Sequence, residues 1–237
     1  MKSIKRKVTV LFILFSFLAI SGSSTTSEEE YNTLESFLDE YGFVTFDSGN
    51  PHNEEGEHPL QLAVDIRNYE VAQLLINEGV NTDIMYALGK DRTGLFECGM
   101  TAEDVEELSK LYGEVEIIEV DLMAEGMSTP AIELTFEDEI SKALALQLSE
   151  MDRTICRIEI YSDIFVTEEG IGIGSTYDDL ENNYLFERVF WGDAGQPVVI
   201  VEALDMSFVL EQGDWWQMGE VVGEIPGDTR IVNIFGW

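Results

Sequence analysis

Apolar residues recur at helical spacing in the first half of the chain. Over 28–41 they predict a helix with one apolar face, made by Tyr31, Leu34, Phe37, Leu38 and Tyr41. Ser27 and Glu30 form a capping box at its start, and Gly42 supplies its end. The segment 43–57 that follows is rich in polar residues, glycine and proline, which predicts an exposed finger.

From residue 114 onward, short apolar segments separated by turns predict strands. Strands are expected at 115–122, 131–136, 154–161, 186–191, 198–203, 206–211 and 230–235, and helices at 139–151 and 176–184. This order of β-β-α-β, followed by a helix and further antiparallel strands, indicates a mostly antiparallel α+β fold.

Residues 58–83 predict a pair of helices. Pro59 belongs in a first helical turn, where its missing N–H costs nothing. Ala63 places a small residue where two helices approach each other. Asn68 fits a tight turn between the helices, and Gly79 ends the second one.

This pair resembles the ankyrin repeat. The matching positions are Pro59, Leu60, Ala63, Val71, Leu74, Leu75, Gly79 and Asn81. The departures are His58, Gln61 and Val80, which replace the usual threonine, histidine and alanine. The resemblance implies a short ankyrin-like helical repeat unit, followed by the α+β domain.

A single repeat cannot bury its own faces, so degenerate neighbours are expected. The helix over 28–41 would be the second helix of a truncated preceding repeat. Residues 93–98 and 102–112 weakly echo the pattern after roughly one period of about 33 residues. Thr101 and Asp104 would begin the helix of this closing repeat, although chance similarity remains an open alternative.

The resemblance also implies protein–protein interaction through the finger and the first helix of the repeat. The expected partner-binding residues are Ser48, His52, Glu54, Glu55, Glu57, Gln61, Asp65 and Asn68. A finger of this composition favours a basic protein partner, whose binding should weaken in salt.

The segment 166–184 and the ending over 225–231 resemble a module of uncharacterised exported bacterial proteins. That resemblance implies no activity. The expected organisation is a signal peptide at 1–23, an ankyrin-like helical repeat domain at 27–113 and an α+β domain at 114–237. A further division of the last domain near 162–169 is left open.

The N-terminus has the pattern of a secretory signal peptide. Lys2, Lys5, Arg6 and Lys7 precede an apolar stretch over 8–20, and small residues follow it. This stretch is shorter than the about 20 residues of a membrane span, although an uncleaved anchor remains the alternative. Because no cysteine lies near the exit, we expect a periplasmic or secreted protein that is not a lipoprotein.

The chain is strongly acidic, with a formal net charge of −34. Removal of the leader leaves 9 of the 13 basic residues against 47 acidic ones. Such a field excludes nucleic acid and anionic membrane surfaces as favoured partners. It favours basic proteins or cations, but adaptation to a salty environment explains the charge equally well.

Motifs of known chemistry are weak. The glycine run over 170–174 before Ser175 and Thr176 fits neither dinucleotide nor P-loop patterns, and a helix-capping turn explains it better. His52 and His58 flank carboxylates and could be zinc ligands, but His58 occupies a helix start. The sequence therefore predicts no catalytic residue, metal or cofactor, and a binding protein rather than an enzyme. An enzyme or small-ligand receptor in the C-terminal domain and a structural envelope protein are the alternatives.

Two further features are left open by the sequence. Cys156 lies on the same face of the predicted strand over 154–161 as Ile158 and Ile160, which predicts a buried thiol. An oxidising compartment would nevertheless permit a disulfide between Cys156 and Cys98. The adjacent tryptophans at 215–216 lie in a glycine-bounded turn. They are expected either to pack on the sheet edge or to serve as exposed anchors.

Overall fold

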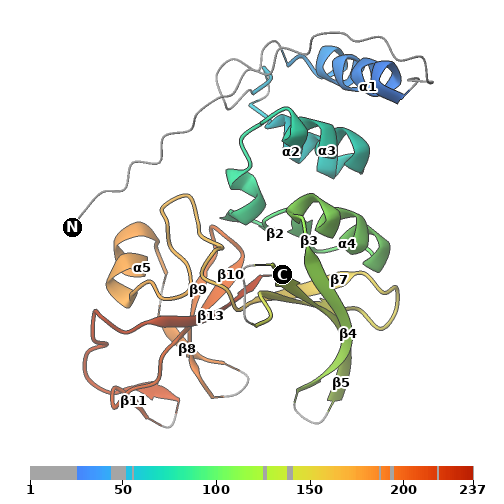
Figure 1. Ribbon diagram of the computed structural model, residues 1–237. Coiled ribbons are helices and arrows are strands. Elements are labelled where there is room, and N and C mark those ends of the chain that lie inside the picture. The colour runs from blue at the N-terminus through green and yellow to red at the C-terminus, as the bar shows by residue number, and fades with distance from the viewer. Residues whose placement is uncertain are drawn as a thin grey trace.

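A computed structural model describes residues 26–43, 52–54, 56–124, 127–137, 141–186, 188–192, 195–217 and 219–236. The predicted signal peptide lies outside these residues. The fold is α+β, as the sequence predicts. Figure 1 shows α1, the α2–α3 pair and α4 stacked one after another above an extended antiparallel sheet, with α5 beside the other end of that sheet.

The α-helices are α1 (Thr26–Glu40), α2 (Pro59–Asp65), α3 (Tyr69–Asn77), α4 (Ala102–Ser109) and α5 (Tyr177–Asn183). Two 3-10 helices are η1 (Asp83–Tyr86) and η2 (Lys110–Tyr112). The helices predicted over 28–41, 58–83, 102–112 and 176–184 are thus confirmed within a few residues. The ankyrin identity of the first three remains a prediction.

Local signals set the α2–α3 pair. Pro59 is the first residue of α2, and the side chain of Asn68 accepts a hydrogen bond from the Val71 N–H as the N-cap of α3. The turn between the helices passes through Arg67 in the left-handed region, with φ +58°. Ala63 is fully buried where α2 and α3 pack together, as expected for a small residue at a close helix contact.

The large sheet has eight strands in the order β4-β5-β6-β7-β13-β10-β9-β8. Its strands are β4 (Val115–Ala124), β5 (Met127–Phe136), β6 (Leu144–Leu148), β7 (Ile155–Ile160), β8 (Val189–Trp191), β9 (Pro197–Val201), β10 (Met206–Leu210) and β13 (Ile231–Gly236). Every neighbouring pair is antiparallel. Because β7 pairs with β13, the segment 162–169 connects two parts of one sheet.

Smaller strands join these elements. Three of them, β1 (Leu88–Gly89), β2 (Arg92–Thr93) and β3 (Phe96–Glu97), form a meander between η1 and α4. The expected closing repeat therefore has strands over 93–97, in place of a first helix, and then the predicted helix α4. A second small sheet pairs β11 (Trp216–Gln217) with β12 (Glu220–Val221).

The helix predicted over 139–151 is wrong: residues 144–148 form β6. This strand lies between β5 and β7, and four of its five residues are buried. A central strand that is covered on both faces reads as a continuous apolar run, which alternation cannot distinguish from a helix. Pairing with both neighbours overrides the helix propensity of its three leucines and its alanine.

The prediction that Cys156 faces the core is also wrong. The register of β6 and β7 shifts between Gln147, which pairs with Arg157, and Leu148, which pairs with Ile155. One extra residue on β7, Cys156, is accommodated as a bulge. Ile155 and Ile158 are both buried on either side of it, while Cys156 is exposed.

One cluster of buried apolar side chains runs from Leu34 in α1 through Leu75 and Leu108 to Ile158 and Ile234 in the sheet. The predicted helical repeat domain and α+β domain therefore contribute to a common core. The boundary between them near 113 and 114 remains a prediction.

Gly94 should be the most sensitive glycine of the meander. Its φ is +58°, and a Cβ there would overlap the Met85 carbonyl oxygen and lie 2.5 Å from the Tyr112 hydroxyl. Gly94→Ala should therefore lower the free energy of unfolding by about 2 kcal/mol more than Gly99→Ala. Gly99 is a matched control, because its φ is +94° and no atom lies within 4 Å of the added Cβ. Urea denaturation measures both, and equal losses would contradict the prediction.

Candidate functional site

Both histidines of the chain line one cleft, which we call the histidine cleft. Its volume is about 760 Å³. Its lining residues are His52, His58, Asn81, Asp83, Ile84, Tyr86, Ala87, Leu88, Val166, Thr167 and Glu168. The cleft thus lies between the start of α2, the η1–β1 segment and the connection that follows β7.

His58 is the central polar group of this cleft. It is the N-cap of α2, and its Nδ1 accepts a hydrogen bond from the Leu60 N–H at 3.3 Å. Only 7% of the residue is exposed, and its Nε2 has no hydrogen-bond partner among the described residues. Because Nδ1 is an acceptor, the neutral ring carries its proton on Nε2, so a buried donor lines the cleft.

Burial and, to a smaller extent, the nearby His52 together lower the pKa of His58 from 6.5 to about 4. The two rings meet edge to face, with centroids 6.0 Å apart. His58 is therefore neutral near pH 7 and adds no positive charge to the cleft.

Backbone pairing holds the opposite wall. The Leu88 N–H donates to the Val166 carbonyl at 2.8 Å, and the Val166 N–H donates to the Tyr86 carbonyl at 3.1 Å. The ring of Tyr86 packs edge to face on Tyr112, with centroids 5.7 Å apart. Because these bonds join segments about 80 residues apart in the sequence, the wall is a non-local feature of the fold.

The charged side chains at the cleft are acidic. Asp83 and Glu168 are both exposed, and the described residues of the lining include no lysine or arginine. The lining also includes the apolar residues Ile84, Leu88 and Val166. An apolar wall with carboxylates and a neutral N–H donor suits a cationic group on an aliphatic stem that also offers a carbonyl oxygen.

The structure places the predicted partner-binding residues in different surroundings. Ser48 and Glu55 lie outside the described residues. His52, Glu54 and Glu57 are exposed, as predicted for the finger. However, the Asn53 side chain donates to Glu57 at 2.7 Å and to the Tyr41 carbonyl at 3.3 Å. These bonds tie the described part of the finger to the end of α1.

The remaining three predicted residues have partners within the fold. The Gln61 side chain donates to Asp65 at 2.5 Å, and Asp65 lies 3.6 Å from Arg92. Asn68 is occupied as the N-cap of α3. Of the predicted set, the structure brings only His52 into the lining of the histidine cleft.

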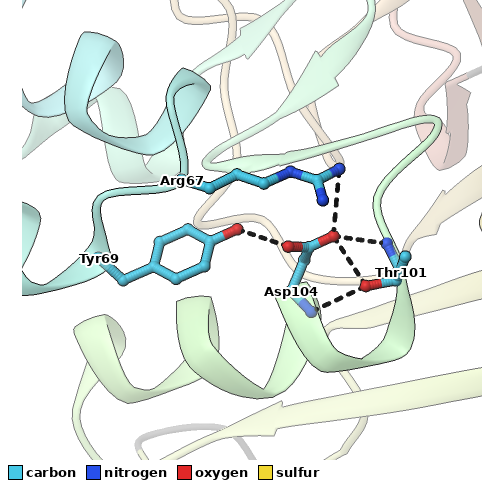
Figure 2. Close-up of polar contacts among 4 residues, drawn as sticks. All are labelled: Arg67, Tyr69, Thr101 and Asp104. Carbon is cyan, nitrogen blue, oxygen red and sulfur yellow. Dashed lines mark hydrogen bonds and ion pairs between the residues drawn. The ribbon is translucent and has the colours of Figure 1, made fainter.

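A second polar cluster, which we call the Asp104 network, links the α2–α3 turn to the start of α4. Figure 2 shows the side chains of Arg67 and Tyr69 pointing toward Asp104 and Thr101. The Tyr69 hydroxyl donates to Asp104 Oδ1 at 2.8 Å, and the Thr101 N–H and hydroxyl each donate to Oδ2 at 2.8 Å. Arg67 lies 3.4 Å from the same oxygen.

Electrostatics support a structural role for this network. Burial favours the neutral form of Asp104, but the hydrogen bonds from Thr101 and Tyr69 and the charge of Arg67 outweigh it and lower its pKa. Every oxygen of this carboxylate already has a partner. The network therefore fixes α4 against the α2–α3 pair, and it confirms Thr101 and Asp104 as a helix start.

The other sequence motifs are structural as well. Thr176 and Asp179 form the capping box of α5, as the helix-capping reading of the glycine run predicts. Trp215 and Trp216 are both buried, and the Trp216 Nε1 donates to the Gly195 carbonyl at 2.9 Å. The reading of these tryptophans as exposed anchors is therefore wrong.

The described part of the chain contains no group of three His, Cys, Asp or Glu side chains placed to hold a metal ion. Nor does any helix within it have the length and apolarity needed to span a membrane.

Sequence reasoning missed most of the cleft. In the sequence, Asn81 is only a match to the repeat pattern, and no local motif marks Asp83, Tyr86 or Glu168 as site residues. Tyr86 and Glu168 line the same cleft because segment 86–88 pairs with Val166. The one local signal was the replacement of the usual threonine by His58 at the start of the repeat.

The sequence matches no protein-family model and no curated protein. Among solved structures it is similar to the crystal structure of the uncharacterized protein yfeY from Escherichia coli, with a TM-score of 0.39 and 17% sequence identity. That similarity covers 56% of this chain and 86% of the other. At this level it indicates neither a shared activity nor a shared site.

Proposed function

We propose that this chain is an exported, acidic binding protein that takes a basic segment of a protein partner into the histidine cleft. The observation that carries the proposal is the buried His58 Nε2, a donor with no hydrogen-bond partner among the described residues, in a cleft of about 760 Å³. A buried donor without an acceptor is costly, so a ligand carbonyl that accepts its hydrogen bond would be favoured.

The charge of the cleft selects the side chain of the ligand. Asp83 and Glu168 would attract a lysine or arginine head group, while Ile84, Leu88 and Val166 would cover its aliphatic stem. The net charge of −34 would also speed the encounter with a basic partner and make it dependent on salt. The ankyrin-like unit contributes His52 and His58 to this surface.

The test uses two fluorescent peptides, Gly-Leu-Lys-Leu-Gly and Gly-Leu-Glu-Leu-Gly, whose fluorescence anisotropy is followed on titration with the protein. The lysine peptide should bind, and binding should weaken by roughly tenfold when salt rises from 0.05 M to 0.5 M. Asp83→Asn and Glu168→Gln should each weaken binding by about three- to tenfold. The acidic peptide should not bind.

Glu150→Gln is the matched control, because Glu150 is an exposed carboxylate in the β6–β7 turn, outside the cleft lining. It should change the affinity by less than about twofold. Equal effects of Glu150→Gln and Glu168→Gln would show that only the overall charge attracts the peptide, and they would sink the assignment to the cleft.

A structural envelope role is the second candidate, because one observation favours it. The buried cluster is continuous from α1 to β13, so the repeat unit packs directly on the sheet. If the repeat unit serves only that packing, neither peptide should bind at low salt.

The proposal includes no catalytic step. Burial raises the pKa of Glu97, which is the kind of shift that an acid catalyst needs, but Arg92 lies 3.5 Å from its carboxylate and lowers the pKa in turn. This pair belongs to the β2–β3 meander and lies outside the histidine cleft. Its arrangement is that of a structural ion pair.

A further inference from the structure

The large sheet ends on an unusually long free edge. The edge strand β4 has ten residues, and all of them pair with β5 on one side, from Val115 opposite Phe136 to Ala124 opposite Met127. Among the described residues no strand pairs with its other side. By contrast, β8 at the opposite edge has three residues and contacts the β11–β12 hairpin.

Such an edge exposes a row of backbone N–H and C=O groups that can template a further strand. Natural proteins usually shorten, bulge or cover an edge of this kind, but the β4–β5 pairing runs through all ten positions without a register shift. Ile117 and Ile118 are 37% and 44% exposed, so apolar side chains flank the edge on both faces.

A groove runs between this strand and the end of α4. Its volume is about 360 Å³, and its lining residues are Glu106, Ser109, Lys110, Gly113, Val115, Ile117 and Glu119. Ser109 is only 2% exposed, and its Oγ has no hydrogen-bond partner among the described residues. A buried hydroxyl without a described partner thus belongs to a residue that lines the groove beside the edge.

The charges along the edge favour a basic occupant. Glu116, Glu119 and Asp121 are all exposed on β4. Lys110 in the groove is already 2.6 Å from Glu107, which neutralises it. A second copy of this chain is disfavoured, because antiparallel pairing of two β4 strands would bring these carboxylates against each other.

We propose that the free edge of β4 and the adjoining groove bind an extended segment rich in lysine or arginine, which adds to the sheet as a ninth strand. The main-chain bonds of β4 supply the affinity, as in other cases of strand addition. The acidic side chains of β4 supply the preference for basic segments. This surface is separate from the histidine cleft, and no residue lines both.

The test uses an acetylated and amidated decapeptide of alternating lysine and valine, and the same peptide with every backbone nitrogen methylated. Both carry the same charge, but the residues of the methylated peptide have no backbone N–H donor. At low salt the first peptide should slow amide hydrogen exchange over 115–124 by at least about fivefold, as measured by mass spectrometry, and the methylated one should not.

Variants locate the site. Neutralising Glu116, Glu119 and Asp121 together as Gln, Gln and Asn should weaken binding at least about tenfold. Neutralising three exposed carboxylates elsewhere (Glu150→Gln, Glu181→Gln and Glu202→Gln) should weaken it less than about threefold. Ser109→Ala should weaken it about threefold without loss of the folded state.

Three results would overturn the inference. They are equal protection by both peptides, protection that falls outside 115–124, and equal effects of the two triple variants. The double variant Asp83→Asn/Glu168→Gln separates this surface from the proposed function. It should abolish binding at the histidine cleft and leave the protection of 115–124 unchanged.

Discussion

Replacing Asp104 with alanine should lower the free energy of unfolding by about 3 kcal/mol. Loss of a capping side chain costs about 1 kcal/mol. The hydroxyl of Tyr69, which donates to Asp104 at 2.8 Å, would lose its acceptor at a cost of about 1–3 kcal/mol. Arg67 adds little, because its side chain is 55% exposed and such ion pairs contribute at most about 1 kcal/mol.

Urea denaturation at pH 7 measures this loss. Glu103→Ala is the matched control, because Glu103 is the exposed neighbour of Asp104 in the same helical turn. It should cost less than about 0.5 kcal/mol. Asp104→Asn should fall between the two, because the amide keeps one acceptor but loses the charge. If Asp104→Ala and Glu103→Ala were equally stable, the network would not hold α4 to the α2–α3 pair.

The same network shows what the sequence can predict. Thr101 and Asp104 are three residues apart, and so are Thr176 and Asp179. A capping box depends only on that spacing and on a following apolar face. Both were recognisable in the sequence, as were Pro59 at the start of α2 and Asn68 between α2 and α3. Each of these features is satisfied by atoms within about one helical turn.

What the sequence could not predict depends on distant partners. Residues 144–148 are a strand because β5 and β7 lie on either side of them. Cys156 is exposed because a bulge in β7 changes which residues of the strand face the core. That bulge is seen only in the pairing of β7 with β6. The Tyr69 hydroxyl reaches Asp104 across 35 positions of the chain. Periodicity along one segment carries no information about any of these contacts.

The candidate site likewise combines features that are visible in the sequence with features that depend on distant partners. His52 and His58 could be singled out because they are the only histidines and flank a finger. Their role could not be read, because it depends on the wall that Tyr86, Leu88 and Val166 build on the other side. The sequence favoured a flexible acidic finger as the binding surface. The structure instead places both histidines in a cleft whose opposite wall combines the segment 81–88 with residues 166–168 of the predicted α+β domain.

Acid should destabilise the protein through His58 in a defined pH window. In the unfolded chain the pKa of His58 is 6.5, and burial and His52 lower it to about 4 in the fold. Above pH 6.5 the ring is neutral in both states, so its contribution to stability is complete. As the pH falls from 6.5 to 4, the unfolded state takes up a proton that the folded state refuses. The resulting loss is about 3 kcal/mol.

Because 47 acidic residues also titrate, the measurement is a comparison of wild type with His58→Asn. Asparagine is a good N-cap and does not ionise, so it preserves the start of α2 and removes the linked proton. Urea denaturation at pH 7, 6, 5 and 4 gives the free energy of unfolding of each protein. It should fall more steeply for the wild type, and relative to pH 7 the extra loss should reach about 3 kcal/mol at pH 4. His52→Gln gives an independent reading, because it leaves one histidine whose imidazole signal can be followed by NMR. A midpoint of that signal near 6.5 would show that His58 is hydrated in the fold. The buried donor on which the proposed function depends would then not exist.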